Sequence, residues 1–188
     1  MKKVLAHVAL AALSLAAAPA ALADEGALKA LSQGGHAVLM RHAKTSGHSK
    51  ALVLDPNGNC SNEDNLSEEG RAQARRLKAM LDKAGAKFDS VMTSPFCRAK
   101  DTAELAFGRA TVEPNLTALE LGTSDQAKAR SEKITAALAR QSGKGNVALV
   151  THRPNIDALT MELVEEGEVI VAKIQPSGML EVITKFKP

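Results

Sequence analysis

Short apolar runs that alternate with helical patterns constrain the fold of this chain more than any other feature. His36–Met40 and Asn146–Thr151 have the length and apolar character of buried strands. Segments with helical periodicity or helix-forming composition lie between them along the chain. Buried strands that alternate with helices are typical of a parallel sheet covered by helices. The sequence therefore predicts an α/β fold.

Caps, turns and periodicity place the other elements. Ser67 is a favourable N-cap, and an apolar stripe follows it, which predicts a helix over residues 67–84. Gly, Pro and Asn residues predict a loop over 45–65, and Ser94-Pro95 predicts the start of a second helix. A further helix is expected over 127–140, and further strands over 90–93, 111–113, 168–174 and 179–184.

The N-terminus has the pattern of an export signal. Lys2 and Lys3 precede an apolar run over residues 4–22, and Ala21 and Ala23 supply the small residues of a cleavage site. We expect cleavage after Ala23, which divides the chain into a signal peptide, 1–23, and a single domain, 24–188. The expected location is periplasmic or secreted. An uncleaved membrane anchor is the alternative for the N-terminus, and no later segment is long and apolar enough to cross a membrane.

The charge balance gives no sign of a nucleic-acid partner. The chain has 24 Lys and Arg residues against 21 Asp and Glu residues, and removal of Lys2 and Lys3 with the signal leaves 22 against 21. It also has no Trp and no Tyr on which bases or sugars could stack. Any attraction for anions must therefore be built locally.

Two cysteines, Cys60 and Cys97, remain after the signal. An oxidising compartment favours a disulfide between them, and two separate buried thiols are the alternative. The cysteines are far apart and have no clustered His partner, so they do not form the pattern of a metal site.

Polar residues that can carry chemistry follow two of the expected strands. Arg41 and His42 come directly after the first apolar run, and His152 comes directly after 146–151. Open α/β sheets bind ligands beyond the carboxyl ends of their strands. Residues more than a hundred positions apart are therefore expected to meet in one crevice.

Four ordered motifs resemble the histidine phosphatase superfamily, in the compact branch that includes cofactor-dependent phosphoglycerate mutases. They are Arg41-His42, Leu66 to Ala74, Ser94 to Thr102 with Arg98, and His152 with Asn155 and Ile156. The resemblance runs from about Ala37 to the C-terminus. It implies a three-layer α/β/α fold with a mostly parallel central sheet.

The resemblance also implies roles for these residues. His42 is the expected nucleophile, and Arg41, Arg98 and His152 are expected to hold the phosphoryl group. Two nearby guanidiniums would lower the pKa of His42 and keep it neutral. Phosphoryl transfer depends mostly on positioning and charge stabilisation, so neither a metal nor another cofactor is expected.

A leaving alkoxide needs a proton, and one carboxylic acid can supply it and later activate water. Glu120 matches the family's acid by its order in the chain, and Asp125 and Glu113 are the alternatives. The catalytic residues expected are therefore His42, Glu120 and His152.

The loop after the nucleophile departs from the family's pattern. Ala43 stands where the family has Gly, which adds a methyl group close to the expected phosphate. His48, six residues after His42, is expected to contact substrate, and Lys44 and Thr45 are candidate rim contacts. A disulfide between Cys60 and Cys97 would hold this loop over the pocket.

These expectations together indicate an exported phosphatase that acts on a small phosphomonoester. The exported members that the chain resembles suggest a sugar phosphate or an envelope component as substrate. The alternatives are a catalytically silent phosphate-binding protein, a phosphohistidine-protein phosphatase and a phosphomutase. The sequence sets neither the leaving group nor the oligomeric state.

Overall fold

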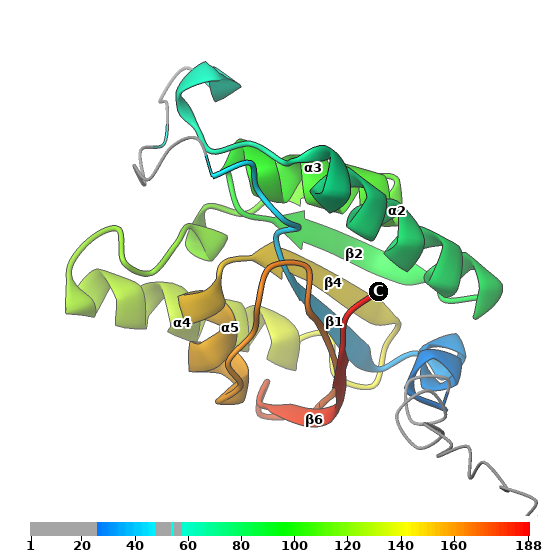
Figure 1. Ribbon diagram of the computed structural model, residues 1–188. Helices are drawn as coiled ribbons and strands as arrows, with labels where there is room; N and C mark the ends of the chain where they lie inside the picture. The colour runs from blue at the N-terminus through cyan, green and yellow to red at the C-terminus, as the bar shows by residue number, and fades with distance from the viewer. Residues whose placement is uncertain (1–25, 48–53, 55–57) are drawn as a thin grey trace, which may run out of the picture.

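A six-stranded mixed sheet forms the centre of the fold in a computed structural model that describes residues 26–47, 54 and 58–188 (Figure 1). The predicted signal peptide and His48 lie outside the described residues. The strands are β1 (His36–Arg41), β2 (Phe88–Thr93), β3 (Thr111–Val112), β4 (Asn146–Thr151), β5 (Val169–Ile174) and β6 (Leu180–Phe186).

The strand order is β3-β2-β4-β1-β5-β6. The first four strands in this order are parallel neighbours, while β5 pairs with β1 and β6 with β5 in antiparallel fashion. The sheet is therefore mostly parallel, as the sequence predicts.

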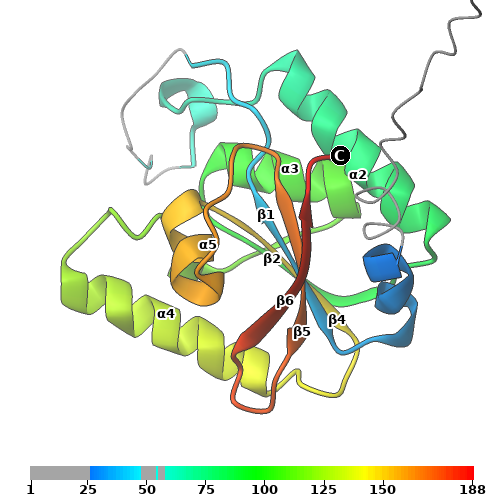
Figure 2. The same ribbon diagram turned by 60° about the horizontal axis from the view of Figure 1, so that its bottom comes forward.

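Helices cover both faces of the sheet. Helices α2 (Glu68–Lys83) and α3 (Cys97–Phe107) lie on one face, and α4 (Ser124–Ala139) and α5 (Arg153–Thr160) lie on the other (Figures 1 and 2). Three short 3₁₀ turns span Leu31–Gln33, Cys60–Asn62 and Pro114–Leu116. The three-layer α/β/α architecture is confirmed. None of the helices in the described ranges is long and apolar enough to cross a membrane.

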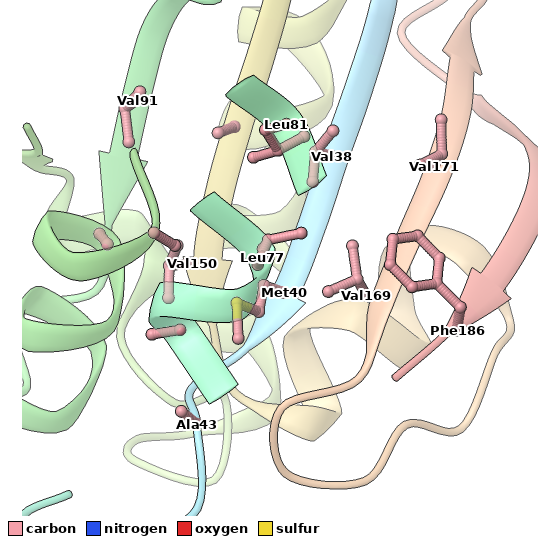
Figure 3. Packing of buried hydrophobic residues seen from close by; sticks show 14 of the residues in the cluster. Val38, Met40, Ala43, Leu77, Leu81, Val91, Val150, Val169, Val171 and Phe186 are labelled. Carbon is pink, nitrogen blue, oxygen red and sulfur yellow. The ribbon is translucent and has the colours of Figure 1, made fainter. Parts of the chain in front are cut away.

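Two apolar clusters fill the two sides of the sheet. Val38 and Met40 of β1 pack with Leu77 and Leu81 of α2 in one cluster (Figure 3). Leu39, between them in sequence, belongs to the other cluster, with residues of α4 and α5. Successive strand side chains point to opposite faces. The central strands are therefore apolar throughout because both of their faces are buried.

Several element boundaries differ from the sequence prediction by one to three residues, and one helix was not expected. Helix α4 begins at Ser124, because Thr123 and Gln126 form a capping box that extends the helix beyond its apolar part. Strand β2 begins at Phe88, two residues earlier than expected. Helix α5 was not expected from the sequence, although Pro154 in its first turn is a favourable helix start.

Candidate active site

The carboxyl ends of three neighbouring strands bring the motif residues together. Arg41 of β1 is in register with Thr151 of β4, and Thr93 of β2 is in register with Val150. His42 and His152 follow these strand ends, and their ring centroids are 5.5 Å apart. The crevice that the sequence predicts is therefore present.

A cavity of about 190 Å³ opens at this edge of the sheet. It is lined by Arg41, His42, Arg98, Ala118, Glu120, His152, Arg153 and Pro154. All the expected catalytic and substrate-binding residues line it except His48, which lies outside the described residues. The candidate rim contacts Lys44 and Thr45 are not among the lining residues. Arg153 and Pro154, at the start of α5, were not expected there.

The hydrogen bonds of His42 define its tautomer. The Nδ1 atom is 3.0 Å from the carbonyl oxygen of Ala43, which can only accept, so Nδ1 carries the proton. The amide of Ala43 is fixed in turn by a 3.0 Å hydrogen bond to Thr102 Oγ1. The Nε2 atom of His42 therefore keeps its lone pair.

Both histidines are neutral at pH 7. Burial lowers the pKa of His42 to about 3, the Ala43 carbonyl opposes this, and Arg98 and Arg41 lower the pKa further. Burial, His42 and the same two guanidiniums lower the pKa of His152 to about 2. The direction for His42 agrees with the sequence prediction, but burial rather than the arginines is the main cause.

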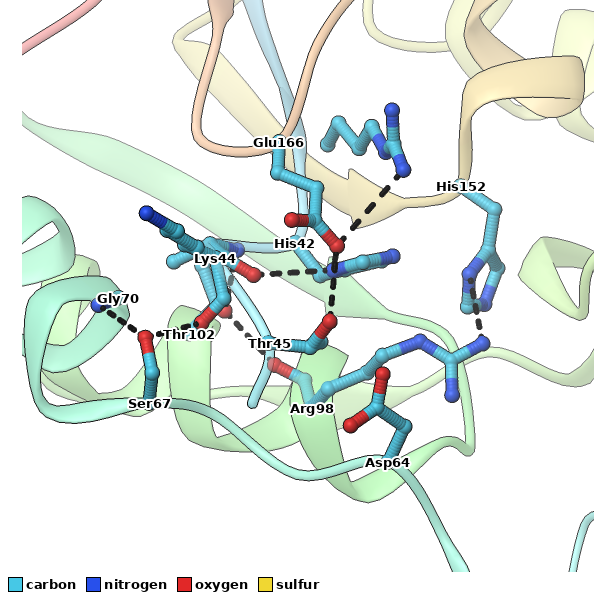
Figure 4. Close-up of polar contacts among 12 residues, drawn as sticks. His42, Lys44, Thr45, Asp64, Ser67, Gly70, Arg98, Thr102, His152 and Glu166 are labelled. Atoms are coloured by element: carbon cyan, nitrogen blue, oxygen red, sulfur yellow. Dashed lines mark hydrogen bonds and ion pairs between the residues drawn. The ribbon is translucent and has the colours of Figure 1, made fainter. Parts of the chain in front are cut away.

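His152 and Arg98 share a support. The Nη2 group of Arg98 donates to His152 Nδ1 over 3.4 Å (Figure 4). The Nε2–H of His152 therefore donates to Ser94 Oγ, 2.8 Å away. Phe96 packs under both residues, with its ring centroid 5.0 Å from that of His152 and 4.3 Å from Arg98 Cζ. The buried Phe96 ring thus helps to fix the positions of the His152 imidazole and the Arg98 guanidinium in the cavity.

A disulfide joins Cys60 to Cys97, as the sequence predicts. It fastens the 3₁₀ turn Cys60–Asn62, near the end of the loop that follows His42, to the start of α3, one residue before Arg98. The buried Glu63 strengthens this connection, because its Oε2 accepts a 2.6 Å hydrogen bond from the amide of Cys97. Burial lowers the pKa of Arg98, and Glu63 is the strongest opposing charge. The disulfide therefore also positions an acidic partner for Arg98.

The structure separates the three candidate acids. Glu120 lies in the turn before α4 and lines the cavity. Glu113 accepts hydrogen bonds from Asn115, and Asp125 is an exposed residue in the first turn of α4, so neither lines the cavity. Of these acids, Glu120 alone is placed to reach a bound substrate.

Glu166 is an acid at the site that the sequence does not predict. Its Oε1 is 3.7 Å from Arg41 Nη2 and 3.9 Å from His42 Nδ1, and it accepts a 3.0 Å hydrogen bond from Thr45 Oγ1 (Figure 4). The next residue, Gly167, donates its amide to the carbonyl of His42 over 3.0 Å. In the sequence, Glu166 belongs to a short acidic run, which is typical of solvated surface. The one local signal is the glycine that follows it, because a glycine allows the backbone to approach another segment closely.

The described residues form no group of three or more His, Cys, Asp and Glu side chains that could hold a metal ion. The cavity instead gathers guanidinium donors around an unprotonated imidazole nitrogen. Such a set can bind a tetrahedral oxyanion and attack it. The geometry of the site is therefore suited to bind a phosphoryl group.

The chain also matches a known protein family over part of its length. A family model described as the histidine phosphatase superfamily, branch 1, matches residues 37–122. Over these residues, which make up just under half of the chain, the sequence is similar to that superfamily. A search of curated protein sequences finds no match.

Solved structures share the fold at low sequence identity. The protein histidine phosphatase SixA, complexed with tungstate, is 18% identical with a TM-score of 0.60, over 81% of this chain and 97% of that one. YhfR of Bacillus stearothermophilus is 18% identical with a TM-score of 0.59, over 78% and 94% of the two chains. The alpha-ribazole phosphatase of Shigella flexneri is 20% identical with a TM-score of 0.58, also over 78% and 94%.

Proposed function

We propose that this protein is an exported phosphatase that hydrolyses phosphomonoesters through a phosphohistidine on His42. The observation that carries the proposal is the state of His42: a neutral ring whose Nδ1–H is held by Ala43, and whose Nε2 lone pair is free beside two guanidiniums. A neutral imidazole is a competent nucleophile toward phosphorus.

In the first step, the Nε2 lone pair of His42 forms a bond to phosphorus as the bond between phosphorus and the ester oxygen breaks. Glu120, in its protonated form, gives its proton to that oxygen, and the alcohol leaves. The Nδ1–H of His42 remains bound to the Ala43 carbonyl and steadies the positive charge that develops on the ring.

In the second step, water attacks the phosphohistidine. Glu120, now a carboxylate, takes a proton from this water as the new bond between oxygen and phosphorus forms. The bond from His42 to phosphorus breaks and returns its electron pair to Nε2. Inorganic phosphate leaves, and both residues regain their starting states.

Arg41 and Arg98 are suited to hold the phosphoryl oxygens through both steps, because each guanidinium can present paired N–H donors. His152 already donates its Nε2–H to Ser94. A bound phosphate dianion would favour protonation of its Nδ1, which would then provide a further donor in place of the contact with Arg98.

Export is supported by the signal pattern at the N-terminus and by the disulfide, which is typical of oxidising compartments. An exported enzyme meets phosphorylated sugars and envelope components, and we propose this class of substrate. The first residue of the exported protein is expected to be Asp24, which N-terminal sequencing of the secreted or periplasmic fraction would test.

The decisive experiment is hydrolysis of 4-nitrophenyl phosphate by the mature protein in the presence of a chelator. His42→Ala is expected to abolish it, whereas His36→Ala, at the opposite end of β1, retains it. Rapid quenching with a labelled ester should trap one acid-labile phosphoryl group on the wild type and none on His42→Ala. Phosphate binding without turnover across a panel of esters would instead establish the silent binding protein.

A further inference from the structure

We propose that Arg153 forms a second oxyanion subsite, which selects phosphomonoesters whose alcohol carries a carboxylate or another phosphate close to the ester oxygen. This inference rests on the proposed function and adds a substrate class to it. The shared chemistry is a planar or tetrahedral oxyanion that a guanidinium can bind with paired donors.

Arg153 lies at the cavity, and its side chain has no polar partner among the described residues. It directly follows His152, and its side chain is exposed at the cavity wall, on the first residue of α5. Within the described ranges it has neither an ion pair nor a hydrogen bond from its side chain. Its guanidinium is therefore available to a ligand.

The position is electrostatically unfavourable in the empty protein. The N-terminus of a helix carries partial positive charge, so a cation on its first residue gains nothing from the helix. Arg153 also repels Arg41, on the wall of the same cavity. An anion bound between these groups would relieve both effects, whereas a neutral leaving group would relieve neither.

The phosphoryl group does not need Arg153. Arg41 and Arg98 already offer paired donors, and the cavity of about 190 Å³ is larger than a phosphoryl group of four heavy atoms, since one liquid water occupies roughly 30 Å³. The cavity therefore also has room for the part of the leaving group next to the ester oxygen.

Glu120 and Arg153 both line the cavity, yet they form no ion pair with each other. If Glu120 protonates the ester oxygen, the atoms attached to that oxygen come within the same walls as Arg153. As Glu120 gives up its proton it becomes a carboxylate, which would repel a negative group on those atoms, and Arg153 is a cation that offsets this repulsion.

The test uses two esters of matched shape, 3-carboxyphenyl phosphate and 3-carbamoylphenyl phosphate, which differ in charge. The quantity measured is the ratio of their kcat/KM values, carboxyl over carbamoyl. We expect the wild type to prefer the carboxyl ester and Arg153→Gln to lower the ratio about tenfold. Arg153→Lys, which keeps the charge, should retain part of the preference. Arg140→Gln, at the end of α4 and outside the cavity lining, makes the same change in net charge and should leave the ratio unchanged.

The para isomers of these two esters extend the measurement to another position of the charge, and 1,3-phenylene bisphosphate extends it to a second phosphate. Turnover of both esters with equal ratios in the wild type and Arg153→Gln would overturn the subsite and leave the phosphatase intact. A ratio lowered equally by Arg140→Gln would also overturn it, because the effect would then be one of net charge. Absence of turnover of every ester by the wild type would overturn the proposed function and the subsite with it.

Discussion

Among single residues, Glu166 lies close to the Nδ1 side of the nucleophile. Its carboxylate is within 3.9 Å of His42 Nδ1 and 3.7 Å of Arg41 Nη2. A negative charge there stabilises the positive charge that the His42 ring gains as Nε2 bonds to phosphorus. We expect Glu166→Gln, which preserves shape and the contact with Thr45, to lower kcat about tenfold with little change in KM, a loss of about 1.4 kcal/mol of transition-state stabilisation.

Glu165→Gln is the matched control, because it removes the same charge from an adjacent exposed residue whose side chain pairs with Lys187. Steady-state kinetics on one aryl phosphate, at several pH values, measure both variants. Equal kcat values for Glu166→Gln and the wild type would show that the carboxylate only shapes the loop.

Residues differ in how well their place in the site can be read from the sequence. His42 and His152 could be placed because each follows a buried strand, and the topology then brings the strand ends together. Glu166, Glu63 and Arg153 could not, because an acid or a base in a loop or at a helix end is usually solvated. Their positions depend on packing between distant segments, such as the hydrogen bond from Gly167 to the His42 carbonyl.

At the scale of the elements, the start of α2 is fitted against the segment that follows the nucleophile. Ser67 caps the helix by accepting from the amide of Gly70, and the Ser67 side chain also donates to the Lys44 carbonyl over 3.1 Å. A Cβ on Gly70 would overlap the carbonyl oxygen of Lys44. Helix α2 therefore approaches the active-site segment at a distance that only glycine allows.

We expect Gly70→Ala to lower the free energy of unfolding by about 1–3 kcal/mol, the range typical of overpacking, and to reduce kcat because Lys44 lies two residues from His42. At an open helical position the same change would stabilise the protein by up to about 1 kcal/mol. Urea unfolding therefore tests the sign of the effect. Arg75→Ala, on an exposed part of α2, is the control for helix propensity, and a stabilised Gly70→Ala variant would contradict the close fit.

The elements that the sequence predicts well are those with strong local signals. Strand β4 was predicted over its full length, and α2 to within one residue at each end, because one is continuously apolar and the other has a clear cap and stripe. Helix α5 was missed because its eight residues include only a few apolar side chains. Its helix is stabilised by the packing of Ile156 in the core, which a local pattern does not reveal.

For the molecule as a whole, the two buried histidines of the active site make the folded protein less stable as the pH falls. His42 and His152 are neutral in the folded protein, with pKa values lowered from 6.5 to about 3 and about 2. The unfolded chain binds a proton at each histidine near pH 6.5, whereas the folded protein does not. Because both pKa values are lowered in the folded protein, the free energy of unfolding is unaffected by these histidines above about pH 6.5 and decreases progressively as the pH falls toward 3.

Between pH 7.5 and 5.5, each histidine should lower the free energy of unfolding by about 1.4 kcal/mol, so the pair contributes about 3 kcal/mol. Urea unfolding at the two pH values measures the total change. His42→Asn/His152→Asn, which cannot titrate in this range, corrects for the other ionisable groups and should show a loss smaller by that amount. The same loss in both proteins would mean that the folded histidines bind protons, which would also remove the neutral nucleophile on which the proposed reaction depends.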